Sequence, residues 1–125
     1  MRYPKIDYTD ESRWLEEKRL ICGDAQAVLS LAGQGLDHGQ IARCLGMYAT
    51  YVRDLMALTR HDDVFRAFRD RDNAPFEAYY TLGKIDDDDA RKELLDLMAG
   101  ASNIGEAQST WADATVESLA NIRLP

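Results

Sequence analysis

Apolar residues recur at spacings of three and four along almost the whole chain, and no alternating apolar and polar run bounded by turn residues occurs. This periodicity predicts an all-α fold. We expect one compact multi-helix domain over residues 1–125, built from about six to seven helices. Two short helices should occupy residues 38–58 and supporting helices residues 62–99. A last helix should run from about residue 103 to about residue 121.

Residues that start or end helices divide this pattern. The first amphipathic stretch begins after Thr9, and Gly23 is expected to interrupt it because glycine weakens a helix interior. Asp24 would then cap a second helix, and Asn73 would cap a later one. These positions predict a break within the N-terminal third of the chain and a short, aromatic-rich helix that ends at Gly83.

Four consecutive aspartates, residues 86–89, are compatible with either a metal site or the start of a helix. They lack the spaced oxygen ligands and the central glycine of a calcium loop, and an apolar stripe at residues 94–98 follows them. Carboxylates in the first turn of a helix are stabilised by the free backbone N–H groups and the helix dipole. Helix capping is the favoured interpretation, and no metal or cofactor is expected.

Residues 38–58 contain the most specific motif in the sequence. Only Gly46, Met47 and Tyr48 separate the two short helices, so the chain must turn within three residues. Gly46 can adopt the left-handed conformation of such a turn, and Ala42 is small where the second helix crosses close to the first. Five apolar positions would lock the pair at a steep angle: Ile41, Leu45, Met47, Val52 and Leu55. This is the pattern of a DNA-binding helix-turn-helix.

Burial of those apolar residues would leave one face of the second helix for recognition. Arginine pairs with guanine, small side chains contact the thymine methyl group, and carboxylates accept from cytosine. This face would carry Ala57 and the candidate base contacts Tyr48, Ala49, Thr50, Arg53 and Asp54. Candidate contacts to the phosphate backbone are Gln40, Arg43 and Tyr51. The alternative is that the two helices only pack together, as in helical modules that dock proteins.

The charge distribution changes this picture only in part. A net charge of −7 excludes a polycation that coats nucleic acid. The basic residues of the middle third are all arginine, a side chain suited to phosphate and guanine, whereas residues 73–125 carry ten acids against four bases. The acidic C-terminal third would suit a basic or apolar protein partner under the docking alternative.

Other classes of protein are disfavoured by the sequence. The longest apolar stretch, residues 25–32, is far shorter than the roughly 20 residues that cross a bilayer, and residues 1–19 lack the apolar core of a signal peptide. A cytoplasmic location is therefore expected. Cys22 and Cys44 should be reduced and packed in the core. The cysteines and the two histidines, His38 and His61, form no nucleophile elbow, metal-spaced cluster or phosphate loop, so we expect no enzyme and no catalytic residue.

Residues 24–107 carry their elements in an order that resembles the central DNA-binding domain of the ParB/KorB family of plasmid and chromosome partition proteins. The resemblance starts at residues 25–37 and is closest at the QIARCLG segment, residues 40–46. Residues 58–68 and 74–82 resemble the short helices that follow the recognition helix in that family. In that family the later helices support the helix-turn-helix and can add DNA contacts. By resemblance, Arg60, Arg66 and Lys84 are therefore candidate contacts to the DNA backbone or bases.

The chain also departs from the family pattern. Tyr48 stands where relatives carry a Ser or Thr that caps the recognition helix, residues 59–61 replace a proline turn, and residues 76–79 lack the usual His and Arg. The sequence contains no N-terminal nucleotide-binding and clamp-forming domain and no evident C-terminal dimerisation domain. Sliding driven by CTP is therefore not assigned, and the chain is expected to be either an excised domain or a small stand-alone relative.

The resemblance implies a bacterial protein, associated with nucleoid or plasmid, that binds a specific double-stranded DNA sequence in partition, transcriptional repression or both. One recognition helix reads only a few base pairs, so a homodimer on an inverted repeat is expected. Partition or transcription proteins are further expected partners, and no membrane is. The alternative is a helical adaptor module that docks proteins and does not bind DNA.

Overall fold

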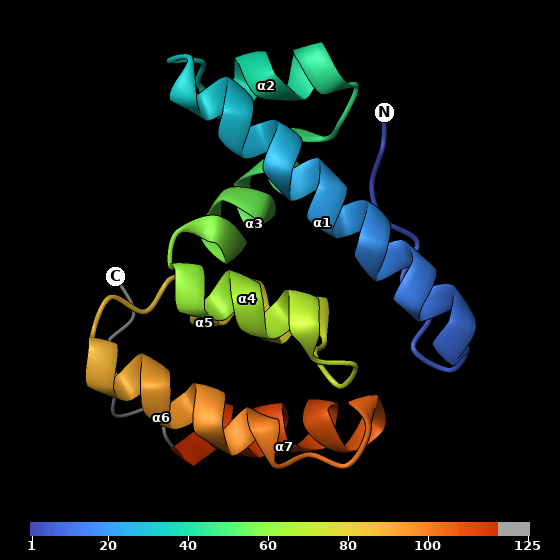
Figure 1. Cartoon of the computed structure of the whole chain (residues 1–125), viewed down its shortest axis with the longest axis vertical. Coiled ribbons are helices and arrows are strands. Elements are labelled where there is room, and N and C mark those ends of the chain that lie inside the picture. The colour runs from blue at the N-terminus through green and yellow to red at the C-terminus, as the bar shows by residue number, and fades with distance from the viewer. Residues whose placement is uncertain (118–125) are drawn as a thin grey trace.

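The computed structural model describes residues 1–117, and within that range the chain folds into seven helices with no strand (Figure 1). The helices are α1 (Glu11–Gly33), α2 (His38–Leu45), α3 (Ala49–Thr59), α4 (Asp62–Asp70), α5 (Phe76–Leu82), α6 (Asp88–Ala99) and α7 (Ile104–Glu117). The predicted all-α class is confirmed. The predicted end of the last helix, at about residue 121, lies outside the described residues.

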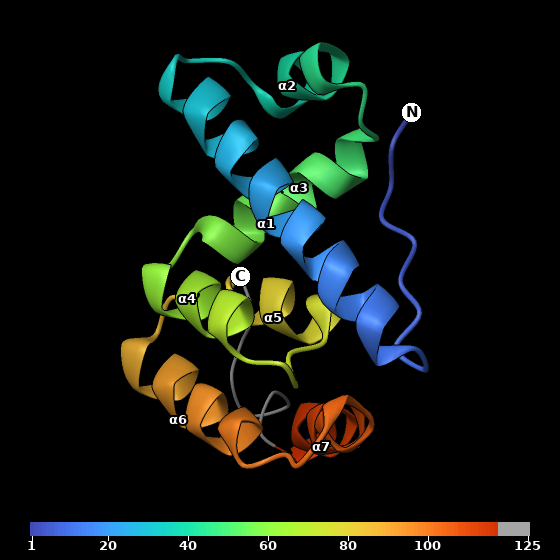
Figure 2. The ribbon, with the colours of Figure 1, turned by 45° about the vertical axis from the view of Figure 1, so that its right-hand side comes forward.

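The helices are arranged around α3, which packs against α1, α2, α4 and α5. The long α1 crosses α3, with α2 at one end of the molecule and the α6–α7 pair at the other (Figures 1 and 2). The N-terminal segment runs back along α1 toward the α2–α3 junction (Figure 2). In the part of the chain that the structure describes, no helix is long and apolar enough to cross a membrane.

The predicted break at Gly23 is wrong, because α1 is continuous from Glu11 to Gly33. Ile21, Ala25 and Val28 are fully buried along one stripe that passes Gly23 on both sides. Glycine inside a helix costs about 0.5 to 1 kcal/mol, which the packing of this stripe offsets. Since the helix does not restart, Asp24 caps nothing and its side chain faces α3 instead.

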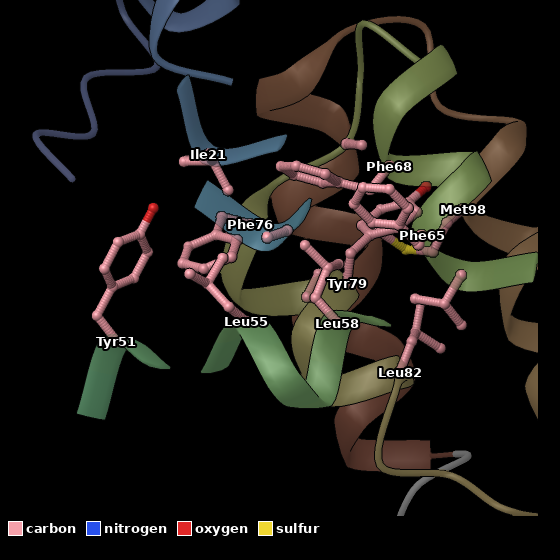
Figure 3. Packing of buried hydrophobic residues seen from close by; sticks show 14 of the residues in the cluster. Ile21, Tyr51, Leu55, Leu58, Phe65, Phe68, Phe76, Tyr79, Leu82 and Met98 are labelled. Atoms are coloured by element: carbon pink, nitrogen blue, oxygen red, sulfur yellow. The ribbon is translucent and has the colours of Figure 1, made fainter. Parts of the chain in front are cut away.

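Aromatic side chains form the centre of the core, as the sequence predicted (Figure 3). The ring centroid of Phe68 lies 5.9 Å from that of Phe76 and 6.1 Å from those of Tyr79 and Trp14, all in tilted or edge-on geometry. Such pairs add about 0.5 to 1.5 kcal/mol beyond the area they bury. The core therefore joins α1, α4 and α5 through one aromatic cluster.

The residue that ends α5 lies very close to the backbone of α3. A Cβ atom on Gly83 would lie 1.9 Å from the carbonyl oxygen of Ala57 in α3. Only a residue without a side chain lets α5 lie this close to α3. Gly83 therefore ends α5, as predicted, and also sets the distance between two helices, which the sequence did not indicate.

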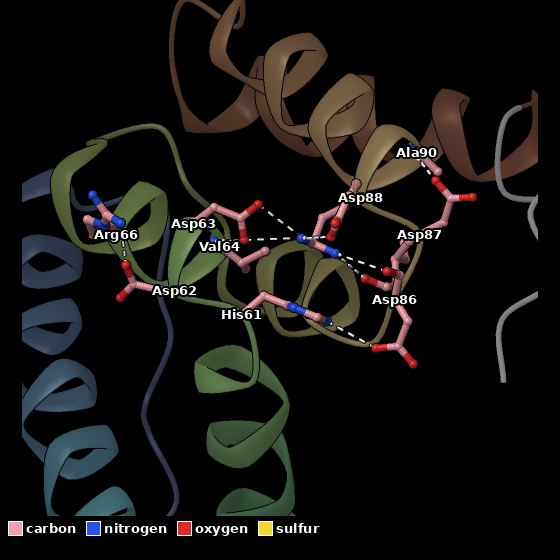
Figure 4. A network of polar contacts seen from close by, with 11 residues as sticks. His61, Asp62, Asp63, Val64, Arg66, Asp86, Asp87, Asp88 and Ala90 are labelled. Atoms are coloured by element: carbon pink, nitrogen blue, oxygen red, sulfur yellow. Dashed lines mark hydrogen bonds and ion pairs between the residues drawn. The ribbon is translucent and has the colours of Figure 1, made fainter.

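Three of the four aspartates at residues 86–89, where α6 begins, act in capping or ion pairing (Figure 4). Asp87 accepts a hydrogen bond from the backbone N–H of Ala90 at 2.9 Å, which confirms the capping prediction. Asp86 pairs with His61 and Asp88 with Arg91. Among the described residues, no group of three or more His, Cys, Asp or Glu side chains is arranged to hold a metal ion.

Arg91 is a buried cation that the sequence did not reveal. Its side chain is almost fully covered, and its Nε donates to Asp63 at 3.0 Å. The Nη1 group donates to the carbonyl oxygen of Ile85 at 2.9 Å. Burying a charge is costly unless it is paired and hydrogen-bonded, and both conditions are met here. Arg91 therefore joins α6 to α4 and to the loop after α5.

Three smaller predictions are wrong. Cys44 is exposed rather than packed in the core, because α2 buries only the side that carries Ile41 and Ala42, whereas Cys22 of α1 is half-buried against the core. Leu97 is exposed rather than part of the α6 stripe, since its neighbours in sequence already fill the buried side. Asn73 does not cap α5, because its amide nitrogen donates to the carbonyl oxygen of Ala101 instead.

Candidate nucleic-acid interface

The turn between α2 and α3 has the geometry that its sequence predicts. Gly46 has φ 66° and ψ 36°, the left-handed conformation that glycine adopts without steric cost. The backbone N–H of Met47 donates to the carbonyl oxygen of Ala42 at 3.0 Å, which closes the end of α2. Four of the five predicted apolar positions are buried, and Leu45 is half-buried. Two helices joined by a three-residue turn thus pack on α1.

The packing leaves the predicted face of α3 exposed. Tyr48, Ala49, Thr50 and Arg53 are all exposed, whereas Asp54 is half-buried. The guanidinium of Arg53 lies 2.9 Å from Nε2 of His38, a residue at the start of α2. This contact orients Arg53 without neutralising it through a carboxylate, so its charge remains available to an incoming acceptor.

Tyr51 does not lie on that face, and its assignment as a phosphate contact is wrong. Its side chain is fully buried, and its hydroxyl donates to the carboxylate of Asp24 at 2.7 Å. Burial and the neighbouring carboxylate both raise the pKa of Tyr51 above its ordinary value. Position 51 is one helical turn before Leu55, so both residues share the buried side of α3.

Gln40 has a structural role that the sequence did not assign. Its side-chain oxygen accepts from the backbone N–H of Asp37 at 2.9 Å, and the Asp37 carboxylate accepts from the backbone N–H of Gln40 at 2.9 Å. The two residues form a capping box at the start of α2. Gln40 is exposed, and the capping box uses only its side-chain oxygen. Its side-chain amide nitrogen therefore remains a donor for a further contact.

The N-terminal segment is part of this region, although no periodic pattern linked it to the motif. Arg2 donates its backbone N–H to the carbonyl oxygen of Gly46 at 2.6 Å and accepts from the backbone N–H of Tyr48 at 3.1 Å. Its guanidinium also pairs with Asp24 at 2.7 Å. The ring of Tyr3 lies 6.4 Å from that of Tyr48, centroid to centroid. The segment thus braces the turn and the start of α3.

The candidate basic residues fall into two groups. Among the described residues, Arg43, Arg53 and Lys84 form no ion pair with a carboxylate, although the ammonium of Lys84 lies over the ring of Tyr80. In contrast, Arg60 pairs with Asp86 at 2.8 Å and Arg66 with Asp62 one turn earlier in α4. Within residues 1–117, the candidate cations without an ion-paired carboxylate therefore lie on α2, on α3 and just after α5, but not on α4.

Lys84 and Asp54 act on each other across the α3–α5 contact. Burial raises the pKa of the Asp54 carboxyl above its ordinary value, and the nearby Lys84 charge opposes that rise. A partly desolvated carboxylate on the predicted face of α3 disfavours an anion at that point and leaves an acceptor for an amine donor.

All the predicted contact residues except Tyr51 and Asp54 are exposed, and those on α2 and α3 surround one continuous turn. No known protein family, curated protein or solved structure matches this chain. The resemblance to ParB/KorB proteins stays a prediction from the sequence.

Proposed function

We propose that this chain binds a specific double-stranded DNA sequence, with α3 in the major groove. The observation that carries the proposal is the exposed side of α3, where Ala49, Thr50 and Arg53 lie together behind a tight glycine turn. A helix fits the major groove, where each base pair displays a distinct pattern of donors, acceptors and methyl groups. Arg53 is suited to a bidentate pair with guanine, and Thr50 and Ala49 to a thymine methyl group.

The start of α3 supports contacts to the phosphate backbone. Tyr48 occupies the capping position without a side-chain hydrogen bond to the helix, so first-turn backbone N–H groups remain open to an anion. Arg43 lies one helix earlier and forms no ion pair within residues 1–117, and the amide nitrogen of Gln40 is a further donor. In this proposal these groups fix the register of α3, and Arg60 and Lys84 extend the contact surface beyond its C-terminal end.

The balance of charge argues for two copies on DNA. Because the chain carries a net charge of −7, its general attraction to phosphate is weak, and one α3 helix reads only a few base pairs. A homodimer on an inverted repeat would double the specific contacts. In the cell, such binding would serve plasmid or chromosome partition, transcriptional repression, or both, with nucleoid or plasmid association and partner proteins of those processes.

Selection from a random duplex library tests the proposal directly. The purified protein is incubated with the library at near-physiological salt, and the bound fraction is recovered and sequenced. A short enriched motif, especially one repeated as an inverted pair, is expected. If neither the native chain nor a covalently fused tandem dimer enriches any motif, the result would favour the adaptor alternative. In that alternative α2 and α3 only pack against each other and do not bind DNA.

A further inference from the structure

A groove runs between α1 and the C-terminal half of α3, and two apolar side chains stand exposed in it. Leu29 of α1 is 46% exposed and Met56 of α3 is 39% exposed. Val28, Ala32 and Ala57 complete its apolar lining. The groove has a volume of about 460 Å³. We refer to it as the Leu29–Met56 groove.

Apart from Thr59, the polar residues that line the Leu29–Met56 groove are cations. Arg53, Arg60 and Lys84 line it, and among the described residues no carboxylate does. Arg60 pairs with Asp86 at 2.8 Å, Arg53 contacts the imidazole of His38, and Lys84 lies over the ring of Tyr80 with the Asp54 carboxylate nearby. In a chain of net charge −7, an apolar groove whose charged lining residues are three cations marks a local field that attracts negative charge, although Asp86 and Asp54 near its edge reduce that field.

The combination of features distinguishes between possible occupants. Phosphate groups would use the three cations but would leave Leu29 and Met56 in water. Exposed apolar side chains within a groove are typical of protein recognition, and an amphipathic helix inserts apolar residues at positions i, i+3 or i+4 and i+7. An occupant that satisfies both parts of the groove needs apolar residues on one side and carboxylates along its flanks.

We propose that the Leu29–Met56 groove docks an acidic amphipathic helix from a partner protein. Its leucine-like side chains cover Leu29 and Met56, and its carboxylates pair with Arg53, Arg60 and Lys84. Burial of a few well-packed apolar residues at the centre supplies most of the affinity in such contacts, and the surrounding charges set specificity and association rate.

Docking in this groove also regulates the proposed DNA contact. Arg53 is both a lining residue of the groove and the central base contact of the proposed function. A carboxylate of the docked helix that pairs with Arg53 would turn its guanidinium into the groove and away from a base edge, so the helix and the DNA compete for this side chain. This regulatory part rests on the proposed function, whereas the docking itself does not.

The probe is a labelled synthetic helix of about 15 residues with leucines at helical spacing on one side and glutamates on both flanks. Its fluorescence anisotropy is measured against the full chain. Saturable binding is expected, and a scrambled peptide of the same composition is expected to bind at least about tenfold more weakly. No saturation, or equal binding of the scrambled peptide, would overturn the docking proposal.

Variants locate the binding on the groove. Leu29→Gln and Met56→Gln are each expected to weaken the binding by about tenfold, because an apolar contact at the centre is lost. The matched control is Leu20→Gln, on the same helix at 47% exposure but outside the groove. Circular dichroism checks that all three variants fold. Equal weakening by Leu20→Gln would place the peptide elsewhere and contradict the proposal.

Competition with DNA separates the two proposals. A duplex selected from the library is added to the peptide complex, and displacement of either ligand by the other is expected. Peptide binding without any selected duplex would support docking while the DNA proposal fails. DNA binding without peptide binding would do the reverse. Simultaneous binding of both would overturn the regulatory part and leave the docking in place.

Discussion

Tyr51 donates its hydroxyl to the Asp24 carboxylate at 2.7 Å and so ties the middle of α1 to the start of α3. The guanidinium of Arg2 pairs with the same carboxylate oxygen, also at 2.7 Å. One carboxylate thus holds the long helix, the proposed recognition helix and the N-terminal segment together. These contacts on the buried side of α3 fix the direction in which its opposite, exposed side faces.

Replacement of Tyr51 by phenylalanine tests this connection. Tyr51→Phe keeps the buried ring and removes only the hydroxyl, and a hydrogen bond to a charged group is worth about 1.5 to 3 kcal/mol. The free energy of unfolding in urea should fall by that amount. Tyr48→Phe, at an exposed hydroxyl, should change it by less than about 0.5 kcal/mol. A similar loss in both variants would show that the hydrogen bond to Asp24 adds no stability beyond that of an exposed tyrosine hydroxyl.

Two glycines should respond to alanine in opposite directions. Gly83→Ala places a Cβ atom against the Ala57 carbonyl oxygen, so α5 must move away from α3, at a cost of about 3 kcal/mol. Gly23→Ala meets nothing within 4 Å inside a regular helix and should gain about 0.5 to 1 kcal/mol. Thermal unfolding measures both changes. Destabilisation by Gly23→Ala would mean that α1 needs its glycine.

The fold class and most helix limits could be predicted because they depend on local periodicity and on end signals. The turn at Gly46 and the cap at Asp87 are examples, since each acts within a few residues. The continuity of α1 through Gly23 could not, because it results from packing against α3, a segment far along the chain. Glycine's local preference predicts a break, and tertiary contact overrides it.

In the candidate site, too, the features set by local sequence could be predicted, and those set by contacts between distant segments could not. The exposed face of α3 could be predicted, because the spacing of the apolar residues shows which side of the helix is buried and hence which side is exposed. The burial of Tyr51, the bracing by Arg2 and the close approach at Gly83 each depend on a partner between about twenty and fifty residues away, and no local pattern encodes such a pairing. The Leu29–Met56 groove likewise exists only once α1 and α3 are packed together.

Asp54 should make the stability of the chain depend on pH. Burial raises the pKa of its carboxyl in the folded state, so the folded state binds that proton more tightly than the unfolded state does. The resulting stability is present at low pH and is lost as pH rises through the folded pKa. Asp54→Asn removes the charged form and should therefore raise the free energy of unfolding at pH 7, with a smaller gain near pH 3.

The measurement for Asp54→Asn is urea unfolding at a series of pH values. Asp96→Asn, an exposed position on α6, is the control, and its effect should stay within about 0.5 kcal/mol at every pH. A gain for Asp54→Asn that is equally large at both ends of the series would contradict the assigned cause, because a titrating carboxyl cannot produce it.

Arg53 and Arg43 are matched in charge and exposure, so their alanine variants separate base reading from phosphate contact. Arg53→Ala should cost about 1 to 3 kcal/mol of binding free energy on a selected duplex and relax the preference at one base pair. Arg43→Ala should weaken binding to all sequences alike and lower the salt dependence by about one phosphate contact. Anisotropy on the selected duplex and on single-base variants of it, at several salt concentrations, gives both quantities. If the two variants lose affinity equally on every duplex, then Arg53 acts only as a positive charge, and the recognition role must pass to Thr50, Ala49 or the half-buried Asp54.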